Sequence, residues 1–455
     1  MRPIATDTAD VPFLMGFTFL KMMFLIASVC TSSLCLAAPG TYDAMVVGAG
    51  PAGVAAALQS GRAGASTLLV ERGVQVGGNM TTGGVNFPGL FHADGRQVID
   101  GCAYEVLTNA AALSGSELPD FTKKPRRHWM HQIRVDIPVY VAVAEEALAK
   151  CGVEVRYHTA PSSVKREDGF WVITLSADGM ASTVKARVLV DCTGDGTLAA
   201  MAGARRMRGD AVSPGSFMYT FSNGRELWSR CDREKFTSAF NEALRNGELD
   251  RLDVPSRPNL MFEGVPSTSW NYVADADSSD AKKRTQTNMR ARASMLRVLR
   301  FLRRQPGMEK IRLGVVSAEV GVRETWRVVG DYVITCEDYV SGRVFDDSVC
   351  YAYYPVDLHS VESGVTPKQL KEGVVPTVPF RALCAEGVPN LLVAGRCVSA
   401  DRLAASGLRV QGACMAMGQV AGQAAAMAAR MKCDVRKIDM EKLKSALSDS
   451  GAIVP

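Results

Sequence analysis

Glycines at fixed spacing mark the first place where this chain could bind a ligand. Residues 42–47 predict a short apolar strand and residues 54–61 a helix; between them stand Gly48, Ala49, Gly50, Pro51, Ala52 and Gly53. In such a turn the first glycine permits a tight bend, the second lets the backbone approach a pyrophosphate, and the third lets the helix pack close to the sheet. The pyrophosphate then rests on the helix N-terminus, where free N–H groups and the positive end of the helix dipole meet it.

An acidic residue follows this turn at the distance that a dinucleotide site requires. A second predicted strand, residues 66–70, ends at Glu71. This is about 20 residues beyond the glycines, where a carboxylate meets the ribose hydroxyls. The strand before the turn, the helix after it and the acid in register make the pattern specific for a dinucleotide. A double glycine comes soon after the acid, within the stretch Arg72, Gly77, Gly78, Asn79 and Thr81.

Two later segments repeat the strand-then-turn pattern. Residues 184–190 predict a strand by their β-branched alternation, and Thr193, Gly194 and Asp195 follow it. Near the C-terminus, a predicted strand over residues 390–394 leads to Gly395 and Arg396, and then past Arg409 and Val410 to a long helix of small residues, 413–429. The N-terminus of that helix would stabilise negative charge on a nearby ring by about 0.3–1 kcal/mol.

These pieces, in this order, resemble the FAD-dependent oxidoreductase family of the two-dinucleotide-binding flavoproteins, which is related to the fumarate reductase and succinate dehydrogenase flavoprotein subunits. The resemblance runs over residues 43–430 and is most specific in 48–84, 188–203, 323–347 and 390–426. It implies an α/β fold, in which a discontinuous, Rossmann-like FAD-binding domain carries an inserted α+β substrate domain. It also implies noncovalent FAD, held by the residues named above from Gly48 to Val410.

Two departures from related flavoproteins limit what the resemblance implies. No second Gly-x-Gly-x-x-Gly occurs, so a separate NADPH domain is not expected and the electron donor or acceptor stays unidentified. Gly395-Arg396 stands where flavin hydroxylases carry Gly-Asp, which counts against a hydroxylase. It leaves open whether Asp401 or only backbone groups hold the ribityl chain.

The domain organisation follows from where these segments lie. We predict a signal peptide or N-terminal anchor over residues 1–38, an FAD-binding domain built from 41–203 and 384–433, a substrate domain over 204–383, and a C-terminal helix and tail over 434–455. Residues 11–38 are apolar apart from Lys21, and they end at a small-residue site of the kind that signal peptidases cut. The protein is therefore expected to be secreted or periplasmic if the signal is cleaved, and membrane-anchored otherwise. No membrane contact is expected of the mature body.

Composition excludes several other classes of protein. The net charge of +5 is small for 455 residues and does not favour nucleic acid. The basic run 282–304 is better explained as an exposed amphipathic helix. None of the twelve cysteines forms a Cys-x-x-Cys pair, which favours free buried thiols. His128 and His131 have a helical spacing suited to a metal, but no third ligand is visible, so we expect them on the surface and no metal site.

The candidate residues for the chemistry lie in the predicted substrate domain. His359 is the best candidate for proton transfer, with a structural role as the alternative. We do not expect Asp357 to orient it, since the two residues are placed on opposite faces of the strand. Arg323, Arg327 and Arg381 are candidates to clamp a carboxylate through forked hydrogen bonds. Glu324 is expected to pair with one of them, in the site or as a structural ion pair.

The sequence therefore predicts an enzyme that passes a hydride between FAD and a small organic substrate, either an organic acid or a polyhydroxylated compound. A flavin oxidase or monooxygenase that uses O₂ is the alternative enzyme. A binding protein that keeps the FAD fold without turnover is the alternative outside enzymes.

Overall fold

The structure is a computed structural model that describes residues 40–455, except 124, 126, 255–258, 264–267 and 361–363. The predicted signal or anchor over residues 1–38 lies outside the described residues. None of the described helices combines the length and apolar character needed to cross a membrane.

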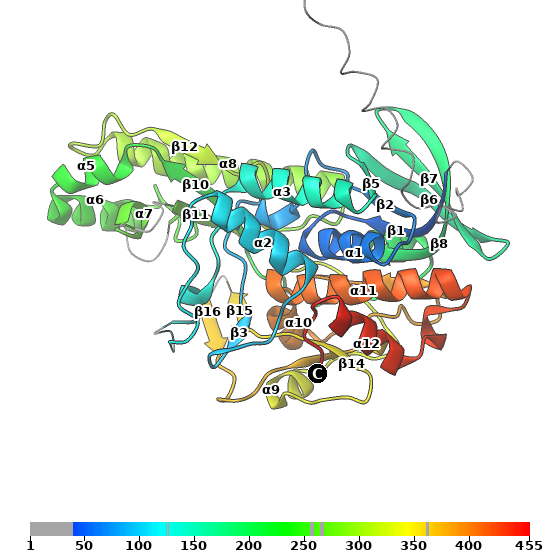
Figure 1. The fold of residues 1–455 in the computed structure, drawn as a ribbon. Coiled ribbons are helices and arrows are strands. Elements are labelled where there is room, and N and C mark those ends of the chain that lie inside the picture. Colours follow the sequence, from blue (N-terminus) through cyan, green and yellow to red (C-terminus); the bar gives the residue numbers. More distant parts are fainter. Residues whose placement is uncertain (1–39, 124, 126, 255–258, 264–267, 361–363) are drawn as a thin grey trace, which may run out of the picture. The chain divides into compact units, whose positions relative to one another are not determined.

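A mostly parallel sheet forms the centre of the described chain (Figure 1). The strand β1 (Thr41–Val47) pairs on one side with β2 (Thr67–Val70), which pairs with β5 (Glu154–Arg156), and on the other side with β8 (Met180–Asp191). The last residues of β8 pair in parallel with β18 (Leu391–Val393). The chain therefore returns to this sheet after nearly 200 residues, and the predicted Rossmann-like α/β fold is confirmed.

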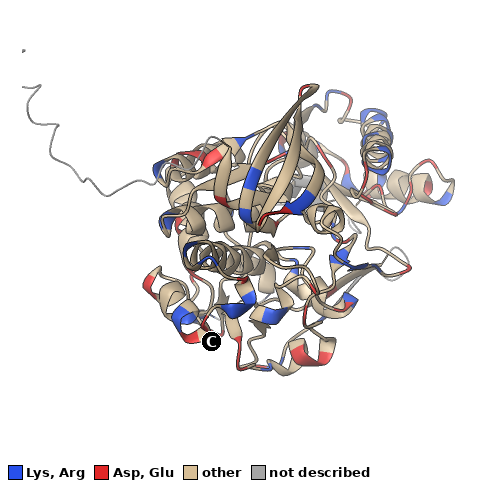
Figure 2. Cartoon of the chain, turned by 90° about the vertical axis from the view of Figure 1, so that its right-hand side faces the viewer, with Lys and Arg blue, Asp and Glu red and all other residues tan. Residues whose placement is uncertain are grey.

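Two long antiparallel strands extend the sheet beyond β8. The strand β7 (Phe170–Ala177) pairs with β8, and β6 (Thr159–Glu167) pairs with β7. Figure 2 shows this side of the molecule, where basic and acidic residues are interspersed on the strands and the loops that join them.

Helices of small residues pack against the parallel strands. The helix α1 (Pro51–Arg62) lies directly beside α11 (Gln411–Met431), while α2 (Cys102–Leu113) and α3 (Ile137–Lys150) pack near α1. A Cβ atom on Gly418 would stand 2.1 Å from the Ala52 carbonyl oxygen, and one on Gly422 would stand 2.1 Å from that of Ala56. The two backbones therefore touch, and this contact sets the middle of α11 against the first turns of α1.

The chain between β8 and β18 includes a region, residues 215–322, with a hydrophobic core of its own, which we call the inserted region. The strands β10 (Gly215–Phe221), β11 (Thr268–Val273) and β12 (Leu313–Val316) form an antiparallel sheet. Its helices are α5 (Gly224–Arg230), α6 (Arg233–Arg245), α7 (Leu260–Glu263) and α8 (Ala281–Arg303). The separate core extends from Phe217 to Val322. Within it, α8 is the predicted basic amphipathic helix: Ala291 and Val298 are buried, and arginines occupy the exposed face.

The second part of the predicted substrate domain packs into the main core instead. Ile334, Tyr339 and Val349 belong to the same hydrophobic cluster as α1 and α11. This part holds α9 (Cys336–Ser341), the hairpin of β15 (Val356–Ser360) and β16 (Gly364–Lys368), and the pair β14 (Ser348–Tyr351) and β17 (Thr377–Pro379). The domain limits at 204 and 383 stay a prediction.

The remaining elements are short or C-terminal. They are β3 (His92–Ala93), β4 (Arg96–Gln97), α4 (Thr197–Met201), β9 (Arg206–Met207), β13 (Arg327–Val328), α10 (Arg402–Leu408), α12 (Met440–Asp449) and single 3₁₀ turns at Gly78–Met80, His128–His131, Phe380–Ala382 and Val435–Lys437. All ten cysteines from Cys102 to Cys433 are free thiols, as the sequence predicts.

The contact between α1 and α11 gives a first testable prediction. Gly418→Ala should lower the free energy of unfolding by about 1–3 kcal/mol, because the added methyl group meets a backbone oxygen that cannot rotate away. Gly412→Ala is the matched control on the same helix, since its nearest neighbour would be 3.1 Å away. Urea denaturation followed by circular dichroism measures both. Equal unfolding midpoints for the two variants would contradict the packing described here.

Candidate functional site

The glycine turn after β1 has the geometry that its spacing predicts. Gly48 has a φ of 95°, and a Cβ there would lie 2.6 Å from the Cys192 carbonyl oxygen; a Cβ on Gly53 would lie 1.8 Å from the Gly48 oxygen. Only glycine fits at these two positions. A Cβ on Gly50 would instead meet no described atom within 4 Å. Open space therefore lies against Gly50 at the start of α1, where a pyrophosphate is expected.

Glu71 directly follows β2, beside this turn. Its Oε2 accepts a hydrogen bond of 2.7 Å from the Ala49 N–H, and its Oε1 accepts one of 2.7 Å from the Gly73 N–H. The carboxylate thus ties the glycine turn to the loop that follows β2, and it stands where a ribose would lie.

The double glycine folds back onto the first turn. The Gly77 N–H donates to the Ala49 carbonyl at 2.7 Å, and a Cβ on Gly78 would lie 3.0 Å from the Gly50 Cα. Asn79 and Thr81, also predicted to bind FAD, hold this loop in shape. Their side chains donate to the carbonyls of Val322 and Val76.

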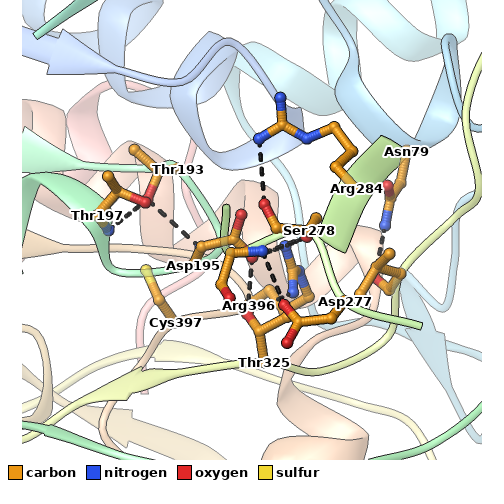
Figure 3. A network of polar contacts seen from close by, with 12 residues as sticks. Asn79, Thr193, Asp195, Thr197, Asp277, Ser278, Arg284, Thr325, Arg396 and Cys397 are labelled. Atoms are coloured by element: carbon orange, nitrogen blue, oxygen red, sulfur yellow. Dashed lines mark hydrogen bonds and ion pairs between the residues drawn. The ribbon is translucent and has the colours of Figure 1, made fainter. Parts of the chain in front are cut away.

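Asp195 organises the turn after β8 (Figure 3). Its side chain is fully buried, and its Oδ1 accepts hydrogen bonds from Arg396 at 2.7 Å, Thr325 at 2.7 Å and Ser278 at 2.9 Å. Burial alone would raise the pKa of Asp195, but Arg396 and Thr325 hold it below its ordinary value. The residue is therefore an ionised carboxylate that fixes the Arg396 guanidinium. Its neighbours Thr193 and Gly194 shape the same turn, which Asp191 stabilises by accepting from the Thr193 and Ala199 N–H groups.

The turn after β18, in the C-terminal part of the chain, forms the third side of the site. Gly395 has a φ of 88°, and a Cβ there would lie 3.0 Å from the Cβ of Ala52 in α1. Val410 begins α11 without a side-chain cap among the described residues, so N–H groups of its first turn stay available. Asp401, whose role the sequence leaves open, caps α10: its two oxygens accept from the Ala404 and Cys336 N–H groups.

These residues fit a bound FAD. The turns after β1, β8 and β18 meet at one edge, because parallel strands place their carboxyl ends together. The space against Gly50 suits the pyrophosphate, Glu71 suits the ribose, and the start of α11 suits the ring that accumulates charge on reduction. The sequence-predicted FAD residues are thus brought together, although Thr81, Asn79 and Asp195 act by holding neighbouring groups.

A cavity lined by four arginines lies next to Arg396. Arg323, Arg327, Arg396 and Arg409 contribute to its wall together with Glu324, and its volume of about 10 Å³ suits one water molecule. Arg323 is fixed on three sides: it donates to the Pro214 carbonyl and to Ser216 Oγ, and its guanidinium lies over the Tyr272 ring, 5.4 Å from the centroid. Burial, helped by the positive charge of Arg409, lowers the pKa of Arg323 to about 10.

Glu324 pairs chiefly with an arginine that the sequence analysis did not single out. Its Oε1 lies 2.9 Å from Arg402 Nη2, whereas its Oε2 lies 3.9 Å from Arg327 Nη1. Arg327 Nη1 has no hydrogen-bond partner in the described chain. Arg402 belongs to no recognisable sequence motif and is 78 residues from Glu324 along the chain. Only the folded chain therefore reveals the pair.

The expectation that Asp357 does not orient His359 is wrong. His359 Nε2 lies 3.0 Å from Asp357 Oδ2, because residues two apart on a strand share a face and only adjacent residues oppose each other. Burial lowers the pKa of His359 below its ordinary value, although Asp357 acts to raise it. Burial would raise the pKa of Asp357, but His359 and Arg409 bring it to about 2. The pair at neutral pH is therefore a neutral imidazole beside a carboxylate.

Two further expectations need correction. Arg381 does not join the arginine cavity: its side chain is half exposed, pairs with Asp347 at 3.1 Å and lies over the Tyr332 ring. His131, expected on the surface, is buried and packs edge-on against Phe121. His128 packs against Tyr354. No group of metal-binding side chains occurs among the residues that the structure describes.

Comparisons with known proteins assign the chain to a family. The family described as FAD dependent oxidoreductase matches residues 43–447. A thioredoxin reductase of Listeria monocytogenes is 51% identical over 50 residues, which are 11% of this chain and 16% of that protein. A thiamine thiazole synthase of Methanoculleus marisnigri is 39% identical over 66 residues, 14% of this chain and 26% of that protein. The chain thus spans only a small part of these curated relatives.

Solved structures show likeness over a longer stretch at low identity. A geranylgeranyl bacteriochlorophyll reductase-like protein from Thermoplasma acidophilum aligns with 90% of this chain and 83% of its own, at 13% identity and a TM-score of 0.42. The family match, which extends over nearly all of the described chain, decides the assignment: this chain belongs to the FAD dependent oxidoreductase family.

Proposed function

We propose that this enzyme transfers a hydride between FAD and a small organic acid whose carboxylate is bound by arginines of this cavity, with one carboxylate oxygen in the water-sized space. The observation that carries the proposal is the wall of that cavity, where four arginines meet a single carboxylate, Glu324. Glu324 is already paired with Arg402, which does not contribute to the wall. Asp195 pairs with Arg396 and Asp357 with Arg409 from outside the wall, so Arg323 is the arginine of the wall without an ion pair among the described residues. Its guanidinium suits an anionic substrate, because its planar donors match a carboxylate in forked geometry.

Arg323 and Arg409 are the residues that would hold the substrate. Arg323 is set in place by Ser216, Pro214 and Tyr272, so little side-chain freedom is lost when a ligand binds. Arg409 donates to the Asp357 carbonyl at 2.8 Å and directly precedes Val410, the cap residue of α11. A carboxylate between these arginines would therefore lie close to the end of α11 where the flavin ring is expected.

His359 is the residue that would move the proton. Its Nε2 is occupied by Asp357, while its Nδ1 is buried and lacks a described partner. A neutral imidazole held in this way can accept a proton at Nδ1, and the carboxylate then stabilises the imidazolium. Bound FAD supplies the hydride acceptor or donor.

The substrate class is tested by anaerobic bleaching of the flavin absorbance against a panel of organic acids and uncharged polyols. Acids should bleach the flavin, and Arg323→Lys should raise the half-saturating acid concentration about 10- to 100-fold, because a charge-assisted hydrogen bond contributes about 1.5–3 kcal/mol. Arg205→Lys is the control: Arg205 is exposed and pairs with Glu386, so its effect should stay within about twofold. Bleaching by polyols alone, unchanged in Arg323→Lys, would rule out the acid.

The proton-transfer role makes a separate prediction about pH. Because the pKa of His359 is lowered, kcat/KM should fall only as the pH drops below the ordinary histidine value of about 6.5. Asp357→Asn removes a group that raises this pKa, so the acidic limb should move to lower pH. His359→Gln should reduce turnover by about 10²- to 10⁴-fold. An acidic limb unaltered in Asp357→Asn would assign the titration to another group.

A further inference from the structure

Three arginines gather around the buried carboxylate of Asp195, and Figure 3 shows two of them, Arg396 and Arg284. Arg396 contacts it directly, and Arg72 Nη1 lies 3.9 Å from its Oδ2. Arg284, from the first turn of α8 in the inserted region, joins through Ser278. The Ser278 carbonyl accepts from Arg284 Nη2 at 3.1 Å, and the Ser278 hydroxyl donates to Asp195.

The positive charge of this cluster is only partly compensated. All three described hydrogen bonds to the Asp195 side chain fall on Oδ1, and its Oδ2, with Arg72 at 3.9 Å, has no described hydrogen-bond partner. Arg284 forms no ion pair with a described carboxylate, and its buried Nε has no hydrogen-bond partner there. Burial lowers the pKa of Arg284, and the charge of Arg72 lowers it further; Glu319, Asp195 and Glu71 act in the opposite sense.

The position of the cluster indicates which anion would complete it. Arg72 directly follows Glu71, whose carboxylate contacts the glycine turn at Ala49, and the open space against Gly50 lies in the same turn. Both oxygens of Glu71 are already bonded to backbone N–H groups, so Glu71 is poorly placed to neutralise a guanidinium as well. A diphosphate carries charge and acceptor oxygens that suit two guanidinium groups at once.

We propose that Arg284, together with Arg72, donates to the diphosphate of the bound FAD, so that a residue of the inserted region holds the cofactor. The segment before α8 is already rigid: Asp280 caps the helix, accepting from the Lys283 N–H at 2.8 Å, and Asp277 pairs with Arg208 at 2.8 Å. Cofactor binding would then stabilise the contact between α8 and the dinucleotide-binding fold. The proposal depends on FAD binding but not on which substrate the enzyme uses.

Retention of the cofactor by the holoenzyme tests this. Flavin fluorescence, which rises as FAD leaves the protein, gives the dissociation constant for Arg284→Gln, Arg284→Lys and the control Arg290→Gln. Arg290 lies on the same helix, is exposed and donates only to the carbonyls of Ala274 and Asp275. Arg284→Gln should raise the dissociation constant of FAD about 10- to 100-fold, and Arg284→Lys should raise it by less. The control should change this constant by about twofold at most.

Displacement of FAD by two fragments separates a phosphate contact from a general loss of structure. ADP carries the diphosphate and adenosine does not. In Arg284→Gln, the dissociation constant of ADP should rise by the same factor as that of FAD, and adenosine should compete as it does in the wild type. Unchanged FAD retention in Arg284→Gln would overturn the proposal. An equal loss of affinity for ADP and for adenosine would overturn it as well. Arg284→Lys, which keeps the positive charge, supplies the same comparison if Arg284→Gln does not fold.

Discussion

Contact between backbones at the carboxyl end of β1 is the constraint on which this structure depends. Gly48 lies against Cys192 at the end of β8, Gly53 lies against Gly48, and Gly395 lies against Ala52, each too close for a side chain between them. Because parallel strands end at the same edge, these contacts bring three turns from distant parts of the sequence around one space. The packing of α11 on α1 through Gly418 and Gly422 fixes the same arrangement from the outside.

A buried ion pair links this cofactor site to the inserted region. Asp195 and Arg396 belong to the dinucleotide fold, whereas Ser278 lies just before α8, in the region with a separate core. Burying a carboxylate costs several kcal/mol unless charge and hydrogen bonds compensate, and here the hydrogen bonds come from both regions. The two cores are thus joined by polar contacts at the place where the cofactor binds.

The arginine cavity shows a second use of buried charge. Burial lowers the pKa of both Arg323 and Arg409. The charge of Arg409 lowers that of Arg323 further and the charge of Arg396 lowers that of Arg409, while Asp357 acts in the opposite sense on both. Such a cluster is stable when neighbouring acceptors hold each guanidinium, as Ser216 and Pro214 do for Arg323. The same arrangement leaves the cavity positive and positions His359 beside it through Asp357.

The sequence by itself determined the parts of the protein that depend on local order. The strand, glycine turn, helix and acid from Tyr42 to Glu71 lie within 30 residues, so spacing alone predicts their geometry and the dinucleotide. The tertiary structure decided the parts that long-range contacts create: Arg402 beside Glu324, Asp195 beside Arg396 and Ser278, and the placement of Arg381 away from the cavity. A charged side chain takes whichever partner folding brings within about 4 Å, and no spacing rule relates partners that lie 78 or 201 residues apart. Asp357 and His359 differ from these pairs: a strand period of two places them on one face, and the expectation that they lie on opposite faces misapplied that period.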